Sequence, residues 1–523
     1  MNVSDNLYRR RKKIAAVLLA ALAVLAVKEY SGGHKKDFYT VSVPAYWGTI
    51  IPPLQHSIVG YGVMINQFEP LVRRGKNGLL EPMGAKAWAF SDDRRTLRFT
   101  IDVSRRFSDG SQVTAADFKR SWEEGLRMRP KSSNSSLSDA LSEVKGFGER
   151  EKNGGISGIR AVGADTLELE FGKPVRSILE QLSSVRYAAY KQTRDGYIGT
   201  GPYVMAEKEK VLTLVPNEHY QGPSPKIKKL LITIVPPGAV ADKLRSGEID
   251  AALFAERAGI SDCDEENINC TFGQEGSHSE MMLNGMPGRF FSDPRRRAAM
   301  QALLWGYFKN NREEWPPVFR GNGFFLDPQS YLRFQAGRLP DAEAEAVIAK
   351  GAPYLDKLAA DSKKNPLVVC SAPNSAWLAG ILEKNGISIS KKSKSDLPEK
   401  DVLGMFYKTQ EPDMIPLTIS VYDGDPDSLY HLLGKHGSIF SPMVERGAVA
   451  DMLESGRKIM DPGGLAPHYM EVSRRILQEV PYVHLGYFYR AIAYNPKRVR
   501  VSEKFMSRNN QSVAVFEPKG FFW

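Results

Sequence analysis

Two patterns of apolar and polar positions alternate along the first part of the chain. Residues 113–126 have helical spacing, and Thr114 followed three residues later by Asp117 is typical of a capped helix start. The segment 239–254 predicts a helix followed by a strand. Strands with apolar and polar residues in turn are predicted at 37–48, 96–103, 166–171, 211–217 and 227–235. This succession favours a mixed α/β architecture.

The middle of the chain repeats this succession after a stretch rich in proline and glycine. Helices are predicted at 293–308, capped by Asp293 with Pro294 at its first position, and at 341–360, 376–386 and 469–480. Strands are predicted at 365–370, 415–424 and 481–496. We therefore expect a second α/β lobe inserted into the first. The predicted parts are an N-terminal segment 1–36, lobe I at 37–275, lobe II at 276–482, and a C-terminal return to lobe I at 483–523.

The N-terminal segment predicts export. A basic stretch precedes an apolar run from Ile14 to Val27, which is shorter than the roughly 20 residues that span a bilayer. Charged and apolar regions in this order are typical of a secretory signal. We expect a periplasmic protein whose N-terminal segment is either a cleaved signal or an uncleaved inner-membrane tether, with no other membrane contact.

Composition narrows the class of function. The chain has 523 residues, 42% of them hydrophobic, which is enough for a large core. The net charge of +11 comes from scattered residues, so we expect a basic surface and no nucleic-acid partner. No string typical of a nucleophile, a zinc-protease helix or a phosphate loop has the required context. We therefore expect a protein that is not an enzyme, with no catalytic residues, cofactor or resident metal.

Six segments between Phe68 and Leu304 resemble, in order and spacing, the solute-binding proteins of ABC importers. The family is that of the oligopeptide-, dipeptide- and nickel-binding proteins, the family 5 extracellular solute-binding proteins. The segments are FEPLVR with LEPMGAKAW, FSDGSQVTAAD at 107–117, GTGPY at 199–203, NEHYQGPSP at 217–225, LRSGEIDAALF at 244–254, and MMLNGMPGRFFSDPRRRAAMQALL at 281–304. The match thins beyond Leu304.

This resemblance implies a bilobal fold like that of periplasmic binding proteins, type II, of the large peptide-binding class. It implies a peptide or peptide-like solute captured between the lobes, closure by a hinge, and delivery to an ABC transporter permease, with the binding protein a monomer. Two alternatives stay open. One is a nickel- or metallophore-binding relative, for which His278 is the nearest candidate ligand, and the other is a non-transport sensor or structural protein that reuses the fold.

The stretch VYDGDPDSLYHLL at 421–433 holds alternating carboxylates. A calcium loop is excluded, because Ser428 stands where that loop needs glycine and Gly434 where it needs glutamate. Asp427 or Ser428 fits a helix cap. The resemblance implies that an Asp of such a loop receives the α-amino group of a peptide, and Asp423, then Asp425, are the candidates.

Other candidate ligand-binding residues are weaker. Tyr46 and Trp47 follow the first strand and offer aromatic surface. Asn284 ends the strand that enters lobe II, and Arg289 can pair with a ligand carboxylate.

The cysteines carry a separate prediction. Cys263 and Cys270 are predicted to form a local disulfide, which an exported chain allows, with free thiols as the alternative. Cys370 ends an apolar run and is predicted to be buried.

Overall fold

The computed structural model describes most of residues 38–501, together with residues 521 and 522. Inside those bounds the description leaves out 45–47, 49, 55–57, 75–78, 129–139, 177, 195, 208–210, 226, 256–267, 317–318, 320–323, 330–336, 371–375, 391–411, 421–427, 435–447 and 502–520. We call the part built on residues 38–255 lobe I and the part built on residues 284–480 lobe II.

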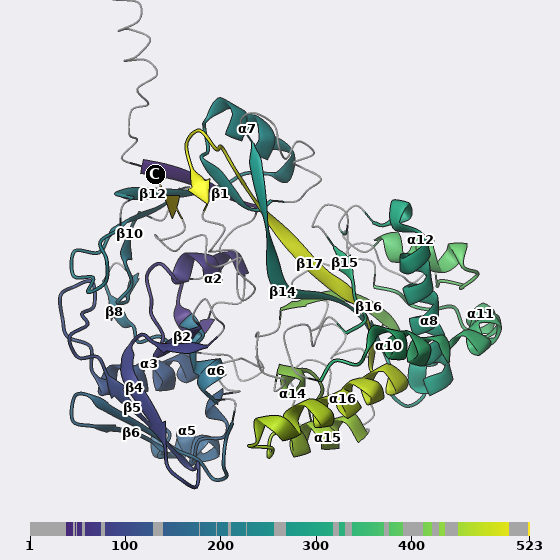
Figure 1. Cartoon of the computed structure of the whole chain (residues 1–523), viewed down its shortest axis with the longest axis horizontal. Coiled ribbons are helices and arrows are strands. Elements are labelled where there is room, and N and C mark those ends of the chain that lie inside the picture. Colours follow the sequence, from purple (N-terminus) through teal and green to yellow (C-terminus); the bar gives the residue numbers. More distant parts are fainter. Residues whose placement is uncertain are drawn as a thin grey trace, which may run out of the picture.

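One nine-stranded sheet runs through both lobes (Figure 1). Its order is β10-β11-β12-β1-β13-β17-β14-β16, and β15 pairs with β17 off this path. β14 (Asn269–Leu283) and β17 (Tyr482–Tyr494) have 15 and 13 residues and pair antiparallel. β17 ends beside β13 in lobe I and β14 ends beside β16 in lobe II, so this strand pair joins the lobes. The remaining strands are β1 (Phe38–Val43), β10 (Tyr203–Glu207), β11 (Leu212–Pro216), β12 (Lys229–Ile234), β13 (Ala251–Ala255), β15 (Phe325–Leu326) and β16 (Met414–Ser420).

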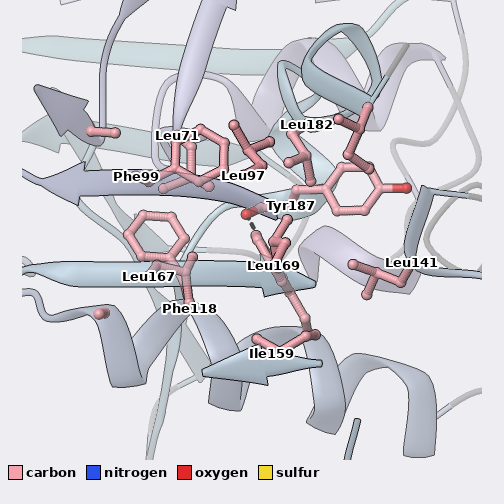
Figure 2. Close-up of a cluster of buried hydrophobic side chains, with 14 of the residues drawn as sticks. Leu71, Leu97, Phe99, Phe118, Leu141, Ile159, Leu167, Leu169, Leu182 and Tyr187 are labelled. Carbon is pink, nitrogen blue, oxygen red and sulfur yellow. Dashed lines mark hydrogen bonds between the residues drawn. The ribbon is translucent and has the colours of Figure 1, made fainter. Parts of the chain in front are cut away.

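A smaller antiparallel sheet forms the outer part of lobe I, at the lower left of Figure 1. Its strands, in spatial order, are β4 (Ala85–Phe90), β5 (Thr96–Ile101), β7 (Thr166–Glu170) and β6 (Ile159–Val162). Helix α3 (Ala115–Arg127) packs Phe118 against side chains such as Phe99 and Leu167 (Figure 2). The predicted helix start is present, since the Asp117 carboxylate accepts the Thr114 backbone N–H at 2.9 Å and its hydroxyl at 2.8 Å.

Lobe II places helices on both faces of β14, β16 and β17. Met281 and Leu283 point into one core, with α8, α11 and α12, while Met282 between them points into a second core, with α14, α15 and α16. Strand alternation thus lets β14 supply two cores at once. The helices are α8 (Pro294–Asn310), α10 (Asp341–Ala349), α11 (Leu355–Lys364), α12 (Ala376–Lys384), α14 (Ser428–Leu433), α15 (Ala448–Gly456) and α16 (Pro462–Glu479).

Short elements complete the described part. They are α2 (Ile58–Met64), α5 (Arg150–Asn153), α6 (Ile178–Leu182), α7 (Val240–Ser246), β2 (Val72–Arg74), β3 (Leu80–Pro82), β8 (Lys191–Thr193), β9 (Gly196–Ile198), β18 (Arg500–Val501) and β19 (Phe521–Phe522).

Several segments that carry the family resemblance meet at one buried carboxylate. Glu69 is 3% exposed, and its carboxylate pairs with Arg105. The Thr200 hydroxyl donates to it at 3.0 Å and the Tyr220 hydroxyl at 3.4 Å. Burial raises the pKa of Glu69 above its usual range, and Arg105 partly offsets the rise. Residues distant in sequence are thus tied together by one charge, which is a structural role.

Asp250 plays a similar part where the chain returns to lobe I. It is fully buried, and its carboxylate accepts the Thr40 backbone N–H at 2.9 Å and lies 3.2 Å from Nε of Arg498. The predicted GEID segment therefore connects β1 and β13 to the residues after β17. The lobe boundaries predicted from the sequence, namely lobe I at 37–275, lobe II at 276–482 and a return to lobe I at 483–523, stay a prediction.

Three predicted elements were wrong in detail. The single helix predicted at 341–360 is two helices, α10 and α11, separated by a short 3-10 turn at Ala352–Tyr354 that contains a proline. Residues 365–370 make only isolated bridges, Leu367 to Ile389 and Val369 to Met414, because just these alternate residues align with a neighbour. The last helix begins at Pro462 rather than at 469. Asp461 caps it by accepting the Gly464 backbone N–H at 2.9 Å, and Pro467 inside the helix hides this early start in the sequence.

Arg105→Met should lower the free energy of unfolding by about 3 kcal/mol, because it leaves the Glu69 carboxylate buried without its counter-charge. Chemical denaturation followed by circular dichroism measures the change.

The matched control is Arg73→Met. Arg73 pairs with Glu81 in the same lobe, but the two side chains are 39% and 41% exposed, so we expect a loss below about 1 kcal/mol. Equal losses in the two variants would contradict the central role given to Glu69.

Candidate functional site

The strand pair that joins the lobes is irregular at its middle. The pairing shifts between Gln274 and His278 of β14, and again between Ser279 and Glu280. Bulges of this kind bend a strand pair and interrupt its hydrogen-bond ladder. Gly486 lies at the second shift, where an added Cβ would stand 2.0 Å from the carbonyl oxygen of Phe325 in β15. The backbone there can approach its neighbour only without a side chain.

A buried polar cluster lies at these shifts. His278 and Glu280 are two residues apart on β14 and so share a face, and His484 is paired opposite Glu280 on β17. Nδ1 of His484 is 2.6 Å from Oε2 of Glu280, and Nδ1 of His278 is 3.6 Å from Oε1. None of the three residues is more than 3% exposed. The Tyr482 ring packs edge-on against His484, with centroids 4.3 Å apart.

Burial sets the charge of this cluster. It raises the pKa of Glu280 well above its usual range, and it lowers the pKa of His484 well below the usual range, with His278 adding to the lowering. Both shifts favour the uncharged form of each side chain. A gained or lost proton would leave a buried charge without compensation.

The cluster does not have the geometry of a metal centre. Ligand atoms about 2 Å from a tetrahedral ion stand roughly 3 Å apart, farther than the 2.6 Å between Nδ1 of His484 and Oε2 of Glu280. Across the part of the chain that the structure describes, no group of three or more His, Cys, Asp or Glu side chains is placed to hold a metal ion.

A second contact joins the lobes away from the strand pair. Arg457, which follows α15 in lobe II, places Nη1 2.7 Å from Oε1 of Glu143 in lobe I. These side chains are 10% and 16% exposed. The Arg457 guanidinium lies over the Tyr430 ring of α14, 4.1 Å from its centroid. A pair this sheltered from water is screened less than an ordinary surface ion pair.

Four of the predicted ligand-binding residues lie outside the described residues: Tyr46, Trp47, Asp423 and Asp425. Their roles stay predictions. Helix α14 begins at Ser428, directly after the acidic stretch, where the sequence predicts a helix.

Asn284 and Arg289 are described. Asn284 is 1% exposed, and its amide nitrogen donates to the Pro412 carbonyl at 3.4 Å while its amide oxygen accepts the Met286 backbone N–H at 3.3 Å. These bonds fix the end of β14. Arg289 is partly exposed and precedes the turn that leads into α8. Contact of either residue with a ligand stays a prediction.

The cysteines divide into two kinds. Cys270 is disulfide-bonded, whereas Cys370 is free and 3% exposed, as its apolar context predicts. Cys263, the predicted partner of Cys270, lies outside the described residues.

Comparison with known proteins shows a similarity to one family over part of the chain. The family model of bacterial extracellular solute-binding proteins, family 5 Middle, matches residues 80–304. The dipeptide-binding protein DppE of Bacillus subtilis is 24% identical over 57% of this chain and 59% of its own length. The nickel-binding periplasmic protein of Escherichia coli is 28% identical over 39% of this chain and 39% of its own length. Residues 80–304 of this chain are thus similar to the middle part of the family 5 extracellular solute-binding proteins, and the chain spans less than two thirds of the length of these curated relatives.

Solved structures extend the likeness of this chain beyond the matched stretch, as a likeness of fold. The murein tripeptide binding protein MppA of Escherichia coli has a TM-score of 0.69 at 17% identity, over 93% of this chain and 98% of that chain. The similarity confirms the predicted bilobal α/β fold. These similar proteins are solute-binding proteins and not enzymes. Among the described residues, no helix is both long and apolar enough to cross a membrane.

Local sequence patterns do not reveal the residues that the structure brings together. His278 was considered only as a metal ligand. The pairing of Glu280 with His484 escapes local reasoning, because His484 lies inside a predicted strand, Glu280 lies shortly before the predicted strand end at Asn284, and their contact is a matter of register. Glu143 and Arg457 are 314 positions apart, and no local pattern links them.

The buried acid predicts a measurable pH dependence. Above pH 4.5, the usual pKa of a glutamate, the unfolded chain releases a proton that folded Glu280 keeps. The free energy of unfolding therefore falls by about 1.4 kcal/mol per pH unit as the pH rises toward the folded pKa. His484 acts in the opposite sense only below pH 6.5, its usual pKa, where the unfolded chain takes up a proton that the folded protein does not.

Between pH 6.5 and 8.5 only the Glu280 effect should remain. We expect the stability of Glu280→Gln relative to the wild type to rise with pH over this range, by at most about 1.4 kcal/mol per pH unit, for as long as the pH stays below the folded pKa of Glu280. Urea denaturation at several pH values measures it. Glu248→Gln, which removes a carboxylate on a side chain 62% exposed, is the control. A difference between Glu280→Gln and wild type that is constant with pH would refute the account of the cluster.

Proposed function

We propose that this protein is exported to the periplasm, captures a peptide or peptide-like solute between its lobes, and delivers it to the permease of an ABC importer. The observation that carries the proposal is the joining of two separately packed lobes by β14 and β17, with register shifts at the crossing. Such a joint suits capture by hinge closure. Capture of this kind needs no bond chemistry.

The comparisons support a peptide as the solute. The relatives include a dipeptide-binding protein, and the structural neighbours include a murein tripeptide binding protein. A peptide can be held largely through its backbone groups, which any extended segment of the protein can pair. Asp423 is our candidate receiver for the α-amino group, and the N-terminal segment 1–36 is our candidate for the export signal or tether.

A metal chelate is the second candidate solute, because a nickel-binding periplasmic protein is among the relatives. His278, the nearest candidate ligand, is 3% exposed and lies beside Glu280 in the buried cluster. Ligation by His278 would require that cluster to rearrange, so we place the chelate second.

Native mass spectrometry of the full chain, purified from the periplasm of its own cells, tests the proposal. We expect a co-purified peptide whose mass is lost on denaturation. A chelate of nickel or a similar metal would replace the first candidate with the second. Protein that carries no solute, and gains none from a mixture of peptides, would contradict both.

The amine receiver has its own test. Asp423→Asn should weaken binding of the co-purified peptide by about thirtyfold, because a charge-assisted bond to the α-amino group is lost. Isothermal titration calorimetry gives the dissociation constants. N-acetylation removes the amine charge, so acetylated peptide should bind wild type and variant equally.

Asp356→Asn is the matched control, since Asp356 is an exposed residue on α11 of the same lobe. We expect it to leave affinity unchanged. An equal loss of affinity for free and acetylated peptide in Asp423→Asn would show that Asp423 does not receive the amine.

A further inference from the structure

We propose that the ion pair between Glu143 and Arg457 is a latch that holds the two lobes together over a bound solute. The inference rests on the proposed function in so far as closure retains a solute. The contact between the lobes can be tested without one.

Both ends of the latch are anchored in packed structure. Glu143 lies between Leu141 and Val144, which are 0% and 2% exposed in the core of the small sheet of lobe I (Figure 2 labels Leu141). Arg457 directly follows α15, and its backbone N–H donates to the Leu453 carbonyl of that helix at 3.3 Å. Each charged group is thus fixed on its own lobe, and the two meet only when the lobes approach.

Tyr430 supports the Arg457 side chain in the position from which it reaches Glu143. Its ring lies beneath the guanidinium, and its hydroxyl donates to Oε1 of Glu454 at 2.8 Å. Tyr430 is 7% exposed, and burial raises its pKa, so the hydroxyl stays protonated and keeps this bond. A guanidinium already stacked on a ring loses little freedom when it meets a carboxylate.

Lys173 makes the latch reversible. Its ammonium nitrogen is 3.3 Å from Oε2 of Glu143, and its side chain is 53% exposed. Lys173 belongs to lobe I, so it stays with Glu143 when the lobes separate. Opening therefore removes one of two cations from Glu143 and leaves the carboxylate compensated, which keeps the open state accessible.

The latch is connected to the predicted solute contact through one short helix. Helix α14 begins at Ser428, directly after residues 421–427, the stretch that holds Asp423. The same helix holds Tyr430, on which Arg457 rests. A solute that contacts Asp423 would therefore act close to the helix that supports Arg457.

The experiment compares Arg457→Met with the wild type by two measurements. Single-molecule fluorescence transfer between dyes at Lys152→Cys and Lys363→Cys, two exposed positions on opposite lobes, reports closure. Stopped-flow dilution reports release of the co-purified peptide. We expect a smaller closed population without peptide, and a dissociation rate constant about tenfold higher with little change in association.

Matched variants separate the pair from other effects. Glu143→Gln should act like Arg457→Met, and the double variant should be no worse than either single one, because both remove the same contact. Arg475→Met, on α16 of the same lobe and 45% exposed, should leave both measurements unchanged. Thermal melting confirms that each variant is folded.

The results distinguish failure of the latch from failure of the proposed function. If Arg457→Met closes and releases peptide as the wild type does, the latch is refuted while peptide capture stands. If the wild type holds no peptide, the proposed function fails, and the closed population without peptide still decides the latch. Additive effects of Glu143→Gln and Arg457→Met would also overturn it.

Discussion

The antiparallel pairing of β14 with β17 is the constraint on which the rest of this protein depends. At one end the pair supplies Met281, Met282 and Val483 to the two cores of lobe II. At the other end it supplies Ile492 and Ala493 to lobe I. Neither lobe can complete its core without these strands, and each strand belongs to both lobes. Any relative motion of the lobes must therefore be absorbed by the pair itself.

The polar cluster lies where the pair is least regular. A slip of β14 by one residue would turn Glu280 to the opposite face and separate it from His484. A buried acid facing a buried imidazole is costly to desolvate, but only the correct register brings the two polar groups into contact with each other. The cluster thus disfavours other registers of β14 against β17 at the place where the hydrogen-bond ladder between the two strands is interrupted. Closure can then bend the strands without changing which residues face each other.

Local chemistry explains how much of the fold was predictable. Thr114 with Asp117, and Asp293 with Pro294, mark helix starts within a few residues, and the strands of the small sheet alternate cleanly. β14 was recognised only at its end, because Gly273, Gly276 and several polar residues interrupt its pattern. The resemblance to a family implied two lobes, which periodicity alone does not.

The candidate site was less predictable, because its described members act across long sequence distances. The pairing of Glu280 with His484 depends on strand register, and that of Glu143 with Arg457 depends on how the lobes meet. Neither leaves a trace in local sequence. Asn284 shows that a residue chosen as a ligand contact from the sequence can have a structural role. Its side chain is hydrogen-bonded to the backbone around it.

Small-angle X-ray scattering tests the central claim, that two lobes joined by β14 and β17 close over a solute. Protein stripped of its solute by partial unfolding and dialysis should have a larger radius of gyration than the same protein after the solute is returned. The account predicts this decrease, together with a change in the scattering curve from two separated lobes to one compact particle. An unchanged radius of gyration, with binding verified in the same sample, would contradict it.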